Sequence, residues 1–376
     1  MQRFRFAGIA LAGALVSCGG GNSGSSTAPP PAGKIGHVFV IVLENKGYAE
    51  TFGTNPPAPY LATTLPAQGA LLTHYYGTGH VSQDNYVSMV SGQAPNATTQ
   101  SDCQIYLDWV GTSSLNADGQ VIGQGCVYPS TVKTIGNQLT DAGLSWKGYM
   151  EDMGNDLSRD GTATCSHPAL NAQDHTQSAT ATDQYATRHN PFVYFHAIID
   201  DQAYCDAHVV PLTQFQADLA SESATPNFAF ITPNLCDDGH DSGCANGDPG
   251  GFTSIDTFLQ NWVPQIMASA AFRKDGLIII TFDESDIEGS PDGTACCNEQ
   301  SGPNTAMAGL IGPGGGLTGA VLISPFITPG TVSDTPYNHY SMLRSVEDMF
   351  GIAHLGYAGQ DGLQPFGADI FGAGEK

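Results

Sequence analysis

Residues 277–284 have the sequence LIIITFDE, and residues 38–45 have the similar sequence VFVIVLEN. Each is a continuous run of β-branched and apolar residues that ends in a polar pair. Such a run is typical of a strand buried on both faces, as in a parallel sheet covered by helices. We therefore expect two central strands, each followed directly by polar side chains.

The two polar pairs, Glu44-Asn45 and Asp283-Glu284, are candidate metal ligands. In open parallel sheets, ligands bind just outside the carboxyl ends of the strands. If both strands end at one edge, carboxylates and an amide meet there and form an all-oxygen site, which suits a hard divalent cation. A single acidic residue at a strand end is more commonly a turn or cap residue. The occurrence of two such pairs favours the metal site.

The rest of the chain alternates between further strand and helix patterns. The predicted strands are 71–76, 145–150, 192–199, 228–232 and 320–324, and the predicted helices are 60–68, 85–90, 132–142, 255–271 and 341–350. This alternation predicts an α/β fold with a doubly wound, mostly parallel sheet between helical layers. The long intervening segments 96–130, 152–189 and 286–307 are expected to be loops that carry function and disulfides.

The N-terminal segment is expected to lie outside the fold. Residues 1–18 have a basic head and an apolar core too short to span a bilayer, and they end in LVSC. This segment resembles a bacterial lipoprotein signal, in which Cys18 would become the lipidated first residue. An ordinary secretory signal with a chance cysteine is the alternative. Residues 19–35 predict a flexible tether and residues 36–376 a single domain, exported and anchored to a membrane at the periplasmic or cell-surface side.

The charge and cysteine content limit the partners and the compartment. The net charge of −24 argues against nucleic acid as a partner. Besides Cys18 there are eight cysteines, an even number that suggests disulfides in an exported chain. Cys103 with Cys126, and Cys236 with Cys244, are plausible local closures, although the sequence leaves the connectivity open. A cysteine metal site is disfavoured because no CxxC pattern is present.

Ser82 is the best candidate for a nucleophile. It lies just before a predicted helix, where free backbone amides and the helix dipole favour negative charge. A bound divalent metal could stabilise its alkoxide, and Asn85, one turn later, could donate to a phosphoryl oxygen. Taken alone, a serine at this position is more commonly an N-cap.

The segment 82–92 resembles the nucleophile segment of the alkaline-phosphatase superfamily, with a serine three residues before an asparagine and a closing Ser-Gly. The ordered set of motifs resembles the bacterial phosphoesterase family of secreted acid phosphatases and non-zinc phospholipases C. Besides the two strand ends and the Ser82 segment, the set contains HNPF at 189–192, ITPN at 231–234, DGHD at 238–241 and YNHYSMLRSVED at 337–348. One departure is Gln83-Asp84, where many relatives have an apolar residue and proline, and it puts the shape of the pocket in doubt.

The resemblance implies roles for particular residues. One divalent cation would be held by Glu44, Asn45, Asp283, Glu284 and the Ser82 oxygen. Asn45 and Asn85 would lie near phosphate oxygens, and His240 would contact the phosphoryl group and protonate the leaving oxygen. Further candidates for substrate binding are His80, His189 and His339. The structural alternatives are a surface histidine for His240, a turn for His189 and a helix cap for His339.

The activity implied is that of an exported, metal-dependent acid phosphatase, which hydrolyses phosphomonoesters through a phosphoserine intermediate. Related phospholipases C are usually longer and generally use threonine as the nucleophile, which favours the phosphatase. Some short exported relatives act on phosphoinositides, so a phospholipid headgroup is a further candidate substrate. The alternatives are a phospholipase C that acts on phosphodiester lipids and a non-catalytic surface lipoprotein that retains the fold.

Overall fold

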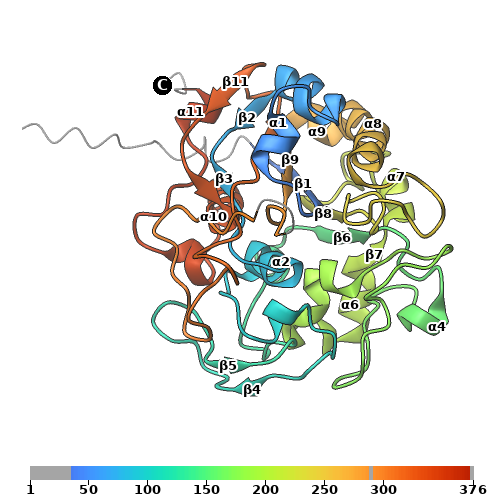
Figure 1. Cartoon of the computed structure of the whole chain (residues 1–376), viewed down its shortest axis with the longest axis vertical. Coiled ribbons are helices and arrows are strands. Elements are labelled where there is room, and N and C mark those ends of the chain that lie inside the picture. The colour runs from blue at the N-terminus through green and yellow to red at the C-terminus, as the bar shows by residue number, and fades with distance from the viewer. Residues whose placement is uncertain (1–34, 288–290, 373–376) are drawn as a thin grey trace, which may run out of the picture.

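The computed structural model describes residues 35–287 and 291–372, so Cys18 and nearly all of the expected tether lie outside the described residues. An eight-stranded sheet forms the centre of the domain, with helices on both sides (Figure 1). Its strand order is β11-β2-β10-β9-β1-β8-β6-β7. Apart from the pairs β10-β9 and β6-β7, neighbouring strands are not consecutive in the chain, as expected for the predicted doubly wound fold.

The two apolar runs quoted above form adjacent central strands. β1 (His37–Leu43) and β9 (Gly276–Phe282) are parallel and pair in register from end to end, so that Leu43 lies opposite Phe282. On the other side of β1 the parallel order continues with β8 (Phe228–Thr232), β6 (Trp146–Met150) and β7 (Val209–Pro211). This register determines which residues follow the two strands side by side at the carboxyl edge of the sheet.

The opposite end of the sheet is mixed. There β10 (Ala320–Ile323) runs antiparallel to β9 and to β2 (Ala70–Leu72), and β11 (Thr331–Ser333) pairs parallel with β2. Two small ribbons lie outside this sheet. They are formed by β3 (Tyr75–Tyr76) with β12 (Tyr337–Asn338), and by β4 (Val110–Gly111) with β5 (Gly123–Gln124).

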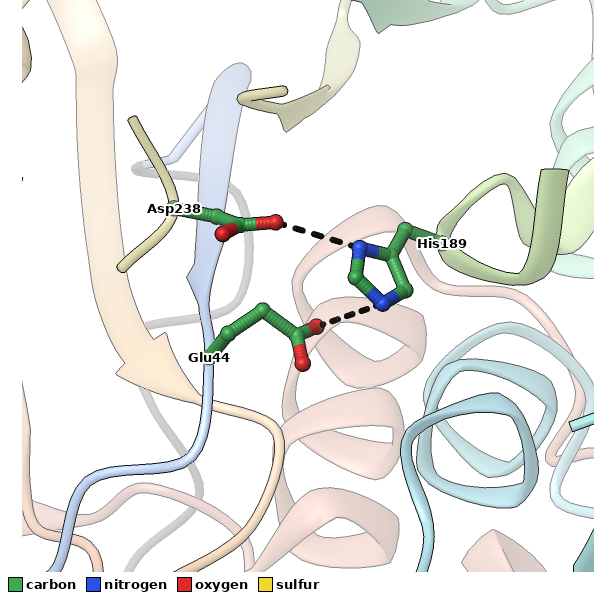
Figure 2. Close-up of side chains that lie close together, drawn as sticks. All are labelled: Glu44, His189 and Asp238. Atoms are coloured by element: carbon green, nitrogen blue, oxygen red, sulfur yellow. Dashed lines mark hydrogen bonds and ion pairs between the residues drawn. The ribbon is translucent and has the colours of Figure 1, made fainter. Parts of the chain in front are cut away.

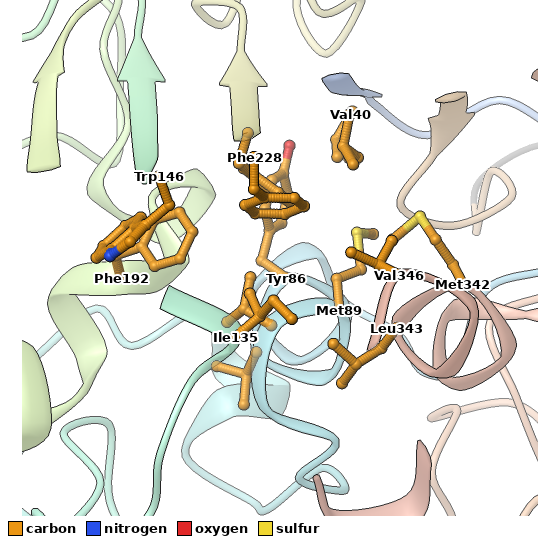
Figure 3. Packing of buried hydrophobic residues seen from close by; sticks show 14 of the residues in the cluster. Val40, Tyr86, Met89, Ile135, Trp146, Phe192, Phe228, Met342, Leu343 and Val346 are labelled. Atoms are coloured by element: carbon orange, nitrogen blue, oxygen red, sulfur yellow. The ribbon is translucent and has the colours of Figure 1, made fainter. Parts of the chain in front are cut away.

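The two faces of the sheet bury alternate side chains of β1 in two separate cores, as the two-residue period of a strand requires. Val38, Val40 and Val42 pack in the core formed with α2 (Ser82–Ser91), α3 (Ile135–Asp141) and α10 (His339–Phe350), part of which Figure 3 shows. Phe39, Ile41 and Leu43 pack in the core formed with α7 (Phe215–Asp218), α8 (Gly251–Ala268) and α9 (Ala270–Asp275). The strand ends are therefore held rigidly between two helical layers.

Shorter helical segments connect these elements. The α-helices among them are α1 (Tyr48–Phe52), α4 (Leu157–Asp160), α5 (His196–Ile199), α6 (Gln202–His208) and α11 (Ala368–Phe371). The 3-10 segments are Pro66–Gln68, Thr99–Ser101, Thr187–His189, Pro191–Tyr194, Leu212–Gln214 and Gly356–Gly359. A π-helical turn covers Tyr60–Thr64. No helix within the described residues is long and apolar enough to cross a membrane.

Three of the predicted elements need correction. The predicted strand 192–199 is wrong, because this segment forms the 3-10 turn Pro191–Tyr194 followed by α5, and its aromatic side chains pack under the sheet. The predicted strand 71–76 is divided by a turn into β2 and β3. The predicted helix 60–68 is helical in two different pieces, a π turn and a 3-10 turn.

Four disulfides fasten the long loops of the described chain. Cys103–Cys126 and Cys236–Cys244 confirm the two expected local closures. Cys165–Cys205 and the vicinal pair Cys296–Cys297 complete the set, which uses all the cysteines expected to pair. The sequence alone did not assign these two bonds.

Candidate active site

The in-register pairing of β1 and β9 places their polar pairs side by side. The backbone N–H of Asn45 donates to Oδ1 of Asp283 at 3.0 Å, and the Asn45 side-chain amide donates to Oε2 of Glu44 at 3.2 Å. Asn45 has a φ of 57°, in the left-handed region, so the chain turns sharply as it leaves the strand. The expected meeting of the two strand ends is therefore present.

Ser82 reaches the same place from the helical layer that packs on one face of the sheet. It is the first residue of α2, following Val81 at the N-cap, and its hydroxyl donates to Oε2 of Glu44 at 2.8 Å. The side chain is almost fully buried, with 3% of its surface exposed. Glu44, Ser82 and Asp283 thus converge as the sequence predicted, while their chemical roles stay predictions.

The site brings several buried carboxyl groups close together. Burial raises the pKa of Glu44 well above its ordinary value, and the charges of Asp283 and Asp238 raise it further. Burial also raises the pKa of Asp283 to about 7, against the opposing effect of the Asn45 N–H. Within the described residues, Oδ2 of Asp283 is buried without a hydrogen-bond partner. A bound cation would supply the missing countercharge.

Glu44 also belongs to a second group that can bind a metal ion, with His189 and Asp238 (Figure 2). Nε2 of His189 lies 3.4 Å from Oε1 of Glu44, and Nδ1 lies 3.1 Å from Oδ2 of Asp238. The ring stacks on Tyr86, with centroids 5.2 Å apart and planes 7° apart. Burial lowers the pKa of His189 well below its ordinary value, so the ring is neutral and able to bind a metal.

The donor atoms of Glu44, His189 and Asp238 lie close enough together to hold a metal ion. The oxygen set with Asn45, Ser82, Asp283 and Glu284 overlaps this group at Glu44 and stays a prediction, because Glu284 pairs with His80. Tyr86 supports both, because its hydroxyl donates to Oε1 of Glu44 at 2.7 Å. The sequence did not single out Asp238 or Tyr86, although Asp238 stands two residues before His240 in the DGHD motif.

A cavity of about 420 Å³ opens beside Ser82. Its walls include Asn45, Lys46, Asp102 and His240. Nδ1 of His240 lies 2.8 Å from Asp241, and a guanidinium nitrogen of Arg188 faces Nε2 at 3.1 Å. As placed, both ring nitrogens are engaged, so His240 can approach a substrate only when its contact with Arg188 opens. The lining residues make this the space in which a substrate would meet Ser82.

Two of the expected substrate-binding histidines instead hold the strand end after β9. His80 pairs with Glu284, and its Nε2 lies 3.1 Å from the carbonyl oxygen of Asp292. His339 lies between the Tyr75 hydroxyl at 3.0 Å and the carbonyl oxygen of Asp283 at 2.6 Å. Burial lowers the pKa of His339 to about 4. Neither histidine lines the cavity beside Ser82, so contact with substrate stays a prediction for both.

Asn85 orders the loop that delivers Ser82. Its Oδ1 accepts from the backbone N–H groups of Thr78 at 2.8 Å and Gly79 at 3.0 Å. Its Nδ2 donates to the carbonyl oxygens of Gly79 at 2.9 Å and Val81 at 3.1 Å. The side-chain amide of Asn85 is thus hydrogen-bonded on both its oxygen and its nitrogen to backbone groups just before α2. A contact between Asn85 and phosphate would require one of these bonds to break.

Comparison with known proteins shows the family. Residues 54–353 match the model of the Phosphoesterase family, and the chain belongs to this family. The match covers α2, with Ser82, and β9, with the Asp283-Glu284 strand end. Glu44 and Asn45 lie just before the matched region, so their assignment to the site rests on the strand pairing.

Among its relatives, the chain is 29% identical over 296 residues to the phosphate-repressible acid phosphatase of Penicillium chrysogenum, covering 78% of this chain and 54% of that protein. It is 23% identical over 351 residues to the phosphatidylinositol-3-phosphatase of Mycobacterium tuberculosis, covering 93% of this chain and 89% of that one. The chain thus spans only about half the length of the fungal relative.

A similar fold occurs in a solved structure, the phosphonate monoester hydrolase SpPMH from Silicibacter pomeroyi. The TM-score is 0.50 at 14% identity, with 90% of this chain and 77% of that chain covered. At this identity the likeness shows the fold alone. It agrees with the predicted α/β fold, in which a mostly parallel sheet lies between helical layers, and this fold class is confirmed.

Proposed function

We propose that this protein is a metal-dependent acid phosphatase that hydrolyses phosphomonoesters through a phosphoserine intermediate. The observation that carries the proposal is the 2.8 Å hydrogen bond from Ser82 to Glu44 at the rim of a cavity. A serine hydroxyl becomes a nucleophile when a neighbouring base takes its proton. Membership of the Phosphoesterase family and the acid phosphatases among its relatives support this assignment.

Glu44 is well placed to take the proton of Ser82. Its Oε2 accepts the hydrogen bond of the Ser82 hydroxyl at 2.8 Å, so the proton has a direct path to this carboxylate. The bond from Ser82 Oγ to phosphorus then forms as the bond to the leaving oxygen breaks. Water hydrolyses the phosphoserine in the second half of the reaction. The position of Ser82 at the start of α2 adds the favourable field of the helix N-terminus.

The residues around Glu44 fit a divalent cation, as their crowded carboxylates and the unpartnered Oδ2 of Asp283 indicate. Glu44, Asn45, Ser82, Asp283 and Glu284 would hold it, with His189 and Asp238 close by. When bound, such an ion supplies positive charge that favours the alkoxide and screens the phosphoryl oxygens. Asn45 stands where its amide can also contact a phosphoryl oxygen at the mouth of the cavity.

The leaving oxygen needs a proton, and His240 is the candidate donor because it lines the same cavity as Ser82. For this role Arg188 must release Nε2 of His240. The freed guanidinium would then be available to a phosphoryl oxygen, which Arg recognises with paired N–H groups. Substrate entry and release of His240 are therefore coupled in this proposal.

The substrate class proposed is the phosphomonoesters, including phosphoinositide monoesters. The relative named phosphatidylinositol-3-phosphatase aligns over most of both chains and supports this extension. A phospholipase C is the second candidate, since it would use the same nucleophile on a phosphodiester. A non-catalytic surface protein is the third, and the intact Glu44, Ser82 and Asp283 disfavour it.

The deciding experiment compares three substrates with the purified protein: an aryl phosphate, a phosphoinositide monoester and lecithin. We expect phosphate release from the first two and no release of phosphocholine from the third. Ser82→Ala should lower phosphate release by about a thousandfold or more, as loss of a nucleophile does. Ser91→Ala is the matched control, because Ser91 ends the same helix and bonds only backbone groups. Unchanged activity in Ser82→Ala would refute the mechanism.

We also propose that the protein is exported and anchored by a lipid on Cys18. The support is the signal-like sequence of residues 1–18 and the tether-like composition that follows. Cys18→Ser should move the protein from the membrane fraction to the soluble fraction of cells that process bacterial lipoproteins. An unchanged distribution would contradict the anchor and leave the catalytic proposal untouched.

A further inference from the structure

Lys46 brings a positive charge to the wall of the cavity beside Ser82. Its ammonium group donates to the backbone carbonyl oxygen of Asn45 at 3.1 Å. The Asn45 side-chain amide donates to Oε2 of Glu44 at 3.2 Å, and the same oxygen accepts from the Ser82 hydroxyl at 2.8 Å. A continuous series of contacts therefore connects Lys46 with the nucleophile and places the lysine inside the site.

The charge of Lys46 is not balanced by a carboxylate. Within the described chain no acidic side chain lies within ion-pair distance of Lys46, whereas Lys147 pairs with Asp218 at 2.7 Å. The Lys46 ammonium lies 5.7 Å from the centre of the Phe252 ring, where a cation and an aromatic face attract each other. A lysine offers three donors on a flexible stem, and the bond to Asn45 uses one of them. The ammonium group is therefore able to bind an anion that enters the cavity.

The cavity is larger than the transferred phosphoryl group alone requires. Its volume of about 420 Å³ lies in the range of sites that enclose a whole small ligand. Its acidic lining residues are Asp102, Glu284 and Asp286. Asp102 lies 3.9 Å from Arg188, and Glu284 pairs with His80, so two of these carboxylates already have basic neighbours. Part of the alcohol can thus share the cavity and meet the positive charge of Lys46.

We infer that Lys46 binds a second anionic group, carried by the alcohol part of the substrate. This inference rests on the proposed phosphatase function and narrows its substrate class to phosphomonoesters whose alcohol is itself anionic. In the proposed mechanism, the cation at Glu44 and the guanidinium of Arg188 already serve the transferred phosphoryl group. Lys46 is left for a charge further along the substrate, so it determines specificity and takes no part in bond breaking.

Two substrates that differ in the second anionic group test this inference. Inositol 3-phosphate has one phosphomonoester, and glycerophosphoinositol 3-phosphate has the same ester and a phosphodiester besides. Wild type should have the higher kcat/KM for the second. Lys46→Met removes the charge and keeps an unbranched stem. It should lower kcat/KM for glycerophosphoinositol 3-phosphate about tenfold more than for inositol 3-phosphate, the effect of losing one hydrogen bond to a charged group.

Two further variants serve as controls for the charge and for the position. Lys46→Arg keeps the positive charge and should retain most of the preference for glycerophosphoinositol 3-phosphate. Lys133→Met removes an exposed lysine that does not line the cavity, and it should leave the preference unchanged. Equal losses of kcat/KM for both substrates in Lys46→Met would place the lysine against the transferred phosphoryl group and overturn the inference.

Binding to a protein that lacks the nucleophile separates this inference from the phosphatase proposal. In Ser82→Ala, adding Lys46→Met should weaken binding of glycerophosphoinositol 3-phosphate about tenfold more than binding of inositol 3-phosphate, as measured by calorimetry. If wild type hydrolyses neither compound and this difference in binding is found, the phosphatase proposal fails and the role of Lys46 stands. Equal weakening for the two ligands, or no binding of either, would refute that role.

Discussion

The hydroxyl of Ser82 donates a 2.8 Å hydrogen bond to the carboxylate of Glu44, although the two residues come from different layers of the fold. Glu44 leaves the central sheet, and Ser82 begins a helix that packs on one face of that sheet. The contact therefore depends on the packing of α2 against β1 and not on local sequence. Small changes in that packing would separate the nucleophile from its base.

The two overlapping ligand sets can be separated by isosteric substitutions. We expect Asp283→Asn to abolish binding of the ion beside Ser82, because Asp283 is a direct ligand in the oxygen set. Asp238→Asn should weaken that binding about 10–100-fold, as loss of a group that orients a ligand does. Affinity is measured by titration with Mn²⁺. Complete loss of binding in Asp238→Asn would instead assign the ion to the set with His189.

The hydroxyl of Tyr86 lowers the pKa of Glu44 through a hydrogen bond. Tyr86→Phe removes a hydrogen bond that lowers the pKa of Glu44, so the carboxyl should be harder to ionise and should bind the cation about tenfold more weakly. Tyr128→Phe is the control, because its buried hydroxyl accepts from Asn96 and contacts neither ligand set. Equal affinities for the two variants would show that the hydroxyl of Tyr86 does not affect the ion.

The raised pKa of Asp283 predicts how stability depends on pH in the absence of metal. The folded state holds this proton more tightly than the unfolded chain, since the pKa rises from the ordinary 3.8 to about 7. Below the pKa that Asp283 has in the unfolded chain, this contribution to the free energy of unfolding is fully present. It is lost as pH rises from about 4 to 7, and the free energy of unfolding then falls by at most about 1.4 kcal/mol per pH unit.

Urea unfolding of the metal-free protein between pH 4 and 7 measures this effect. Asp283→Asn should make the free energy of unfolding depend less on pH. Part of the dependence should remain, because the pKa of Glu44 is also raised. Excess metal should offset the loss, because a cation binds the ionised carboxylates and stabilises the folded state at higher pH. A stability that increases with pH in the metal-free wild type would contradict the assigned direction.

His240 as proton donor predicts a dependence on the leaving group. An alkyl alcohol needs a proton as it leaves, whereas a nitrophenolate does not. His240→Gln should therefore slow hydrolysis of alkyl phosphates by about 10²–10⁴-fold and have a much smaller effect on aryl phosphates with good leaving groups. His354→Gln is the control, since that histidine pairs with Asp348 away from the cavity. Equal slowing of both substrates would remove His240 from this role.

The two central strands, and the meeting of the polar pairs that follow them, could be predicted because each strand is one continuous run of apolar and β-branched residues. Residues 38–43 are all apolar, residues 277–282 are interrupted only by the β-branched Thr281, and in parallel neighbours the residues that follow must meet at one edge. Ser82 could be placed because a helix pattern followed it. In each case one local pattern determined both the element and its end.

Other parts depended on tertiary contacts. The apolar segment 192–199 has the composition of a strand, but it packs as short helical turns because Phe192 fills the space against Trp146 under the sheet. Asp238 lies in a polar loop, and only the folded chain brings it to His189. The same holds for Tyr86, whose hydroxyl faces Glu44 from another layer. Residues of this kind have no periodicity that would reveal them.

The direction of β1 has a practical consequence. The chain enters this strand at His37 and reaches the Ser82 edge only after Leu43, at the far end of the sheet. Anything joined ahead of β1 therefore meets the domain on the side remote from the cavity. A fusion partner or an immobilising surface attached there should leave the mouth of the cavity pointing outward, open to molecules arriving from solution.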